Sequence, residues 1–165
     1  MTGRRLWSSA IRRRVALALV ALAAAGWLVY AQWWGRGGAH ELAWRDLNPR
    51  LGQVEFTRKV TVVYRSPVPF AHLLKATMPG RAPKPPPVDF DRREVVVVSL
   101  GPRSSTGYSL RVERVVERRR GIDVYLRERA PSLGDPVEPD VTYPYRAITI
   151  ARSSKPVSVK LQGRP

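Results

Sequence analysis

The pattern of hydrophobic and polar positions divides the chain into two parts. Residues 15–34 read VALALVALAAAGWLVYAQWW, a run of 20 residues without a charge. As a helix this run is about 30 Å long, which matches the hydrocarbon thickness of a bilayer. Residues 1–14 contain five arginines and no acid, and basic residues beside a span stay on the cytoplasmic side. The pattern predicts a cytoplasmic basic n-region, a single-pass transmembrane signal anchor and a C-terminal domain outside the cytoplasmic membrane.

A cleaved signal peptide is the alternative for the same run. Ala23 and Ala25 form an A-x-A site, and Val29 with Ala31 forms a weaker one. We favour the uncleaved anchor because the apolar run continues past both sites and ends in aromatic residues, which prefer the membrane interface. Cleavage would make the protein secreted, so both alternatives export the C-terminal part.

The segment after the anchor has little periodicity. Residues 35–53 combine glycines, scattered charge and an Asn-Pro pair, and we expect a juxtamembrane spacer with little structure. Residues 54–87 are expected to contain a β-branched strand, a short helix at residues 69–77 and a stiff proline-rich connector.

From residue 88 onward the pattern is that of β-strands. Residues 94–100 (EVVVVSL) form an apolar run typical of a strand buried on both faces. Alternation in residues 108–116 and 122–127 predicts a hairpin, with a bulge where Val115-Val116 breaks the phase. Residues 147–151 and 156–161 add two short strands. We therefore expect a mainly β fold with about five antiparallel strands in a small sheet, sandwich or barrel at residues 88–165. No parallel crossover is expected, because no helical pattern lies between these strands.

Charge and composition narrow the function. The chain has 29 Lys and Arg against 13 Asp and Glu, for a net charge of +16. Because the excess is spread along the chain without a nucleic-acid recognition motif, a solvated basic surface that faces an anionic cell envelope is favoured over a nucleic-acid interface. The absence of cysteine excludes disulfides, thiolate chemistry and cysteine-based zinc sites.

The sequence contains few candidate catalytic side chains. His40 and His72 have no serine, cysteine or carboxylate at a spacing that would form a nucleophile and base pair. Asp89 and Asp91 flank Phe90, and a solvated strand entry with the ring turned inward is favoured there over a metal or acid-base pair. The sequence therefore predicts no catalytic residue, no metal site and no cofactor, and a protein that is not an enzyme.

Two loop motifs are the candidate binding features. Residues 101–107 (GPRSSTG) present small hydroxyl residues between two glycines, and residues 142–145 (TYPY) place two tyrosines around a proline. The first loop lacks the lysine of a phosphate-binding loop and is followed by a strand, so phosphate binding is not expected. Of the two tyrosines, one ring should pack inward and one should stay near the surface, and exposed tyrosine is a common binding anchor. The predicted partner-contact residues are Arg103, Ser104, Ser105, Thr106, Gly107, Tyr108, Tyr143 and Tyr145.

These motifs carry a resemblance to a known family. The V-D-F entry at residues 88–90, the loop at residues 101–108, the T-Y-P-Y box and the K-P-V ending at residues 155–157 together resemble the PrcB C-terminal domain, named from an accessory subunit of a bacterial surface protease complex. The resemblance covers residues 88–159. It departs from the family in having a single glycine, Gly107, where the family doubles it, and no cysteine before T-Y-P-Y. The resemblance implies an extracytoplasmic, non-catalytic β domain that binds and stabilises a protein partner such as a protease.

Two other binding functions stay open at this stage. A basic module that binds anionic cell-envelope polymer would lose affinity steeply with salt, whereas tyrosine and backbone contacts to a protein would not. The third function is a loop presented to a protease as in chagasin-like inhibitors, although Ser105-Thr106-Gly107-Tyr108 matches only part of their N-P-T-T-G-Y/F motif.

Overall fold

The described residues fall into two units. The computed structural model describes residues 24–27, 39–78, 80 and 84–162. Residues 24–27 are helical, and all the others lie in the compact unit Ala39–Pro165. Most of the predicted anchor, residues 15–34, lies outside the described residues and stays a prediction. In the part of the chain that the structure describes, no helix has the length and apolarity needed to cross a membrane.

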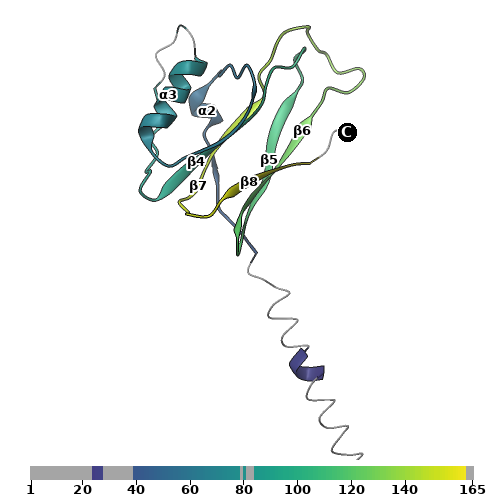
Figure 1. Ribbon diagram of the computed structural model, residues 1–165. Coiled ribbons are helices and arrows are strands. Elements are labelled where there is room, and N and C mark those ends of the chain that lie inside the picture. The colour runs from purple at the N-terminus through teal and green to yellow at the C-terminus, as the bar shows by residue number, and fades with distance from the viewer. Residues whose placement is uncertain (1–23, 28–38, 79, 81–83, 163–165) are drawn as a thin grey trace, which may run out of the picture. The chain divides into compact units, whose positions relative to one another are not determined.

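The unit Ala39–Pro165 contains two sheets of four strands each, drawn in Figure 1. The first sheet is antiparallel and has the order β2 (Arg45–Asp46), β7 (Tyr145–Ala151), β4 (Arg93–Leu100), β3 (Lys59–Tyr64). The second has the order β1 (His40–Glu41), β5 (Ser109–Arg118), β6 (Gly121–Arg129), β8 (Val157–Gln162). The prediction of a mainly β fold is confirmed. The sequence analysis allowed a small sheet, a sandwich or a barrel. The two sheets are not closed and form a sandwich.

Strand β4 lies between two hydrophobic cores. Val95 and Val97 face a core that they share with Phe70 and Leu74 of helix α3 (Pro67–Thr77) and with Leu51 of the short helix α2 (Asn48–Leu51). The alternate side chains face the core between the sheets. Figure 1 shows α2 and α3 on the side of β4 and β7 that faces away from β5 and β6. The predicted burial of this strand on both faces is therefore confirmed, and the domain has three layers.

The core between the sheets is aliphatic. Its fully or nearly fully buried members are Val96, Val98, Leu100, Leu110, Val112, Val115, Ile122, Val124, Leu126, Ile148 and Ile150. Removing apolar surface from water at about 25 cal/mol per Å² makes this core the main source of stability in a domain without cysteine. It holds β5 and β6 against β4 and β7, and so fixes the loops at the ends of these four strands.

Strands β5 and β6 form the expected hairpin, with registered pairs from Ser109 and Arg129 to Arg118 and Gly121. The register shifts between Val112 and Arg114, so Glu113 is the extra residue of a bulge. The predicted bulge exists, and it lies two residues before the position expected from the phase break at Val115.

The prediction of an antiparallel sheet without a parallel pair is wrong for β8. Val157 to Gln162 pair in parallel with Ile122 to Arg127 of β6. A helical crossover is not needed, because the preceding strand β7 lies in the opposite sheet and returns the chain to the end where β6 begins. There the amide of Ile122 donates to the carbonyl oxygen of Pro156 at 2.9 Å.

The prediction of an unstructured spacer at residues 35–53 is wrong for residues 40–52. These residues form β1, β2 and α2, and they bury Leu47 and Leu51 against the first sheet. The side chain of Asn48 acts as a strand partner for β7: it donates to the carbonyl oxygen of Tyr145 at 3.0 Å and accepts from the amide of Ala147 at 2.8 Å. The β domain therefore begins near residue 39 and includes the segment at residues 54–87.

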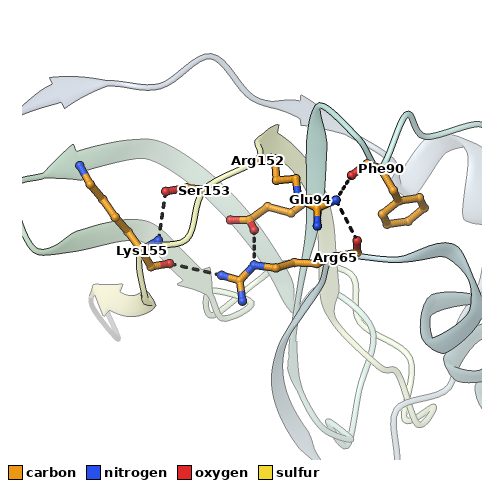
Figure 2. A network of polar contacts seen from close by, with 6 residues as sticks. All are labelled: Arg65, Phe90, Glu94, Arg152, Ser153 and Lys155. Carbon is orange, nitrogen blue, oxygen red and sulfur yellow. Dashed lines mark hydrogen bonds and ion pairs between the residues drawn. The ribbon is translucent and has the colours of Figure 1, made fainter.

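A polar network closes the sandwich at the end where β4 begins, as Figure 2 shows. Glu94 is fully buried, and its Oε2 lies 2.8 Å from Nε of Arg65, which follows β3. Arg65 also donates to the carbonyl oxygen of Lys155, and Arg152 donates to the carbonyl oxygens of Arg65 and Phe90. The network joins β3, β4 and the connection between β7 and β8.

Candidate functional site

Two loops meet at the other end of the sandwich, and we call residues 101–108 and 130–144 together the loop end. The backbones of Arg103 and Thr142 bond to each other in both directions, at 2.8 and 3.0 Å. The amide of Thr106 donates to the carbonyl oxygen of Glu138 at 3.0 Å, and the Thr106 hydroxyl accepts from the Glu138 amide at 2.9 Å. The hydroxyl of Thr142 donates to the carbonyl oxygen of Ser105 at 2.9 Å. The sequence motifs GPRSSTG and TYPY are therefore parts of one surface.

Glycine is required at the closest approach of the two loops. Gly107 has φ +89°, and a Cβ there would lie 3.0 Å from Cβ of Pro131 and 3.1 Å from Cγ1 of Val137. Only glycine combines this conformation with this contact at low cost. The single glycine of this chain is therefore part of the packing between the loops.

Arg103 has an internal role. Its Nε lies 2.8 Å from Oε1 of Glu128, a carboxylate whose side chain is 8% exposed. Its Nη1 donates to the carbonyl oxygens of Leu100 and Pro102, and its guanidinium carbon lies 5.9 Å from the centroid of the Tyr108 ring. These contacts use the guanidinium to hold the loop to the end of β6.

The two tyrosines of the TYPY box differ in exposure. Tyr145 is buried against Phe56, with ring centroids 5.4 Å apart, and its hydroxyl donates to the carbonyl oxygen of Gly52 at 2.7 Å. Burial raises the pKa of the Tyr145 phenol to about 12. Tyr143 and Tyr108 are half-buried. Of the three tyrosines predicted to contact a partner, Tyr145 supports the domain from inside, whereas Tyr108 and Tyr143 reach the surface.

The remaining predicted contact residues are spread over the same loop. Ser104 and Gly107 are exposed, and Ser105 and Thr106 are half-buried with backbone atoms used between the loops. The loop therefore presents Ser104 and Gly107 at its surface and uses its centre to hold its shape.

An open groove of about 450 Å³ lies beside the TYPY box. Tyr108 and residues 140–145 line one part of it, and residues 52–55, which follow α2, line the other. The groove includes the exposed carboxylates of Glu55 and Asp140. Sequence reasoning missed both, because they lie 85 positions apart and no local motif joins them.

Exposed apolar side chains occur in the same loop end. Leu133 is fully exposed, Val141 is 54% exposed and lines the groove, and Val137 is 43% exposed beside Gly107. Sequence reasoning missed these residues, although the sequence carried a signal for them. Aliphatic residues in a loop rich in proline and glycine are expected to stay at the surface. Aliphatic and tyrosine side chains gathered on one surface are typical of a protein-binding site.

The structural class is therefore a small β sandwich whose loop end carries exposed apolar side chains and a tyrosine-lined groove. Residues 95–151 match the family model described as PrcB C-terminal. The matched segment runs from β4 to the end of β7 and contains both loops. The resemblance seen in the sequence is confirmed by this match. No curated protein and no solved structure matches the chain.

Proposed function

We propose that the domain binds a protein partner through its loop end, and that it acts outside the cytoplasmic membrane as an accessory or stabilising subunit for a protein such as a protease. The observation that carries the proposal is that one loop end exposes Leu133, Val137 and Val141 and also holds a groove lined by two half-buried tyrosines. Leaving such side chains in water brings no gain in folding, whereas burying them against a partner does.

The family match and the sequence of the N-terminal third support the finer parts of the proposal. Residues 95–151 match the family whose resemblance implies a protease-associated protein. Residues 15–34 have the length and apolarity of an anchor preceded by arginines. We infer from the anchor that the domain is held on the outer face of the membrane with its N-terminus inside. The β domain itself contributes binding and no reaction step.

The proposal is tested by site-specific photo-crosslinking in living cells. A photoreactive amino acid replaces Leu133 in the loop end, and the matched control replaces Ser158, which is exposed in β8 on the second sheet. Mass spectrometry should identify one discrete protein captured from position 133 and absent from position 158. Equal capture at both positions, or no protein at position 133, would contradict the proposal.

A second candidate function is favoured by the outer face of the second sheet. Six exposed bases and two acids follow the outward positions of β5, β6 and β8: Arg111, Arg114, Arg118, Arg127, Arg129 and Lys160, with Glu113 and Asp123. The guanidinium carbon of Arg114 lies 4.5 Å from the centroid of the Tyr125 ring, which holds one of these charges in place. This face would suit an anionic cell-envelope polymer.

The two functions are separated by salt and by charge reversal. Polymer binding should fall steeply between low and physiological salt and should be lost in an R114E/K160E variant. Capture of a protein from Leu133 should survive both changes. Loss of that capture in R114E/K160E would favour the polymer function over the loop end.

A loop inserted into a protease as an inhibitor is less favoured by the geometry. Ser105 and Thr106 are bonded to residues 138 and 142, so the centre of the loop cannot extend into a cleft without losing these bonds. An inhibitor should reduce the turnover of the protein captured from Leu133, whereas an accessory subunit should maintain or raise it.

A further inference from the structure

The groove beside the TYPY box differs in charge from the rest of the protein. The chain carries a net charge of +16. The groove is nevertheless lined by two carboxylates, Glu55 and Asp140, and its described lining contains no lysine or arginine. A third acid, Glu138, is exposed in the loop at residues 130–144, which also contains Asp140.

The two carboxylates of the groove are free of ionic partners among the described residues. Seven of the 13 acids in the chain form ion pairs with basic side chains among the described residues. Neither Glu55 nor Asp140 is one of these seven. The protein has more than twice as many bases as acids. Two carboxylates without ionic partners in one concave site therefore make the potential in this groove locally negative.

Aromatic rings complete the site. Tyr108 and Tyr143 line the same groove and are half-buried. Tyrosine rings attract cations held over their faces, and a guanidinium also stacks on them through its flat surface. Carboxylates and tyrosine rings therefore favour the same ligand, a cation on a flexible or planar side chain.

We propose that this groove receives an arginine or lysine side chain of the partner protein, with Glu55 and Asp140 as its counter-charges and Tyr108 and Tyr143 as its walls. The inference rests on the proposed function and names the chemistry of the partner. Val141, which also lines the groove, would cover the aliphatic stem of the basic side chain.

The inference is tested by nuclear magnetic resonance with the full-length chain in zwitterionic detergent micelles. The probes are N-acetyl-arginine amide and N-acetyl-citrulline amide, which have nearly the same shape and differ in charge. The arginine probe should shift the signals of Tyr108, Thr142 and Tyr143, and the citrulline probe should bind more weakly. Equal shifts from both probes, or no shift of these signals up to the solubility limit of the arginine probe, would overturn the inference.

A charge-neutral variant and a matched control sharpen the test. E55Q/D140N should lower the affinity for the arginine probe by about fivefold, given the strength of exposed ion pairs. E138Q removes one charge from the same loop outside the groove lining and should change the affinity little. Equal affinity of E55Q/D140N and wild type would overturn the inference. Both changes are at exposed positions, and thermal unfolding of each variant verifies its fold.

The two proposals can fail separately. If Leu133 captures a protein in cells while arginine and citrulline bind alike, the loop end is a protein-binding site that does not select a basic side chain. If the arginine probe binds the groove and no protein is captured, the proposed function fails and the groove is a cation site without a protein partner.

Discussion

Arg103 and Glu128 form an ion pair with 2.8 Å between Nε and Oε1. The pair joins the loop after β4 to the C-terminal end of β6. The side chains are 23% and 8% exposed, so the pair is largely removed from water. Because the bonds between Arg103 and Thr142 hold the second loop to the first, this pair contributes to the shape of the whole loop end.

Replacing Arg103 should destabilise the domain. R103A leaves the carboxylate of Glu128 nearly buried without its cation, which should lower the free energy of unfolding by about 2 kcal/mol. The matched control is R127A, whose partner Glu113 lies in an exposed pair at 60% and 28% exposure and should cost less than about 1 kcal/mol. Urea unfolding followed by tryptophan fluorescence measures both. Equal losses in the two variants would contradict the structural role of Arg103.

The contact between the two loops can be tested at glycine. Gly107 and Gly134 both have positive φ, +89° and +96°, but only Gly107 has neighbours that a Cβ would meet. Both alanine variants should lose about 1 kcal/mol from backbone strain. G107A should lose more in urea unfolding and should increase hydrogen exchange at Thr106 and Thr142. A smaller loss in G107A than in G134A would contradict the packing of the loops.

The buried phenol of Tyr145 predicts a pH dependence of stability. Its pKa is about 12 in the folded protein, against an ordinary value of 10.0 for tyrosine. The folded state therefore keeps the phenol proton where the unfolded state loses it. The contribution of the hydroxyl to stability is complete below pH 10 and is lost as the pH rises towards 12.

The variant Y145F isolates this effect. At pH 8 it should be less stable than wild type by about 1 kcal/mol, because the carbonyl of Gly52 loses its donor. The difference between wild type and Y145F should shrink as the pH rises above 10, when both proteins are unfolded in urea under the same conditions. A difference that stays constant across this range would show that the phenol is not the titrating group.

The buried carboxylate of Glu94 predicts an asymmetry between removing one partner and removing both. R65A leaves a fully buried charge without its cation and should cost about 3 kcal/mol. R65A/E94M replaces the charge with an apolar side chain of similar length and should recover most of this loss. A double variant that is no more stable than R65A would contradict the assigned contact.

Much of the sandwich could be predicted from local sequence patterns. The run at Glu94 to Leu100 has an apolar pattern typical of a strand buried on both faces, and β4 is that strand. The alternation around Ser109 and Ile122 likewise predicted the hairpin of β5 and β6. These elements are determined by short-range periodicity, which sequence reasoning detects well.

The first and last strands were harder to predict for physical reasons. Strands β1 and β2 have only two residues each, too few to show a period, and they are held by long-range pairing with β5 and β7. The parallel direction of β8 depends on the path of the chain between the two sheets, which no local pattern records.

The sequence predicted the two loop motifs of the candidate site but not the residues that lie beside them in the folded domain. Tyr108 and Tyr143 were identified and do line one groove. The internal role of Arg103 depends on Glu128, which a sequence pattern does not place beside it. Glu55 comes from a segment expected to be a separate strand region, so its meeting with Asp140 required the tertiary structure.

The central claim is that the loop end is the surface that holds the partner. The most direct measurement is the yield of the adduct formed in cells from a photoreactive residue at Ser104, compared between two charge-matched double variants. L133D/V141D places charges at exposed apolar positions of the loop end, and V62D/L161D places them at exposed apolar positions in β3 and β8. The account predicts loss of the adduct in L133D/V141D and its retention in V62D/L161D. An adduct that persists in L133D/V141D, with both variants folded and present at equal amounts, would contradict it.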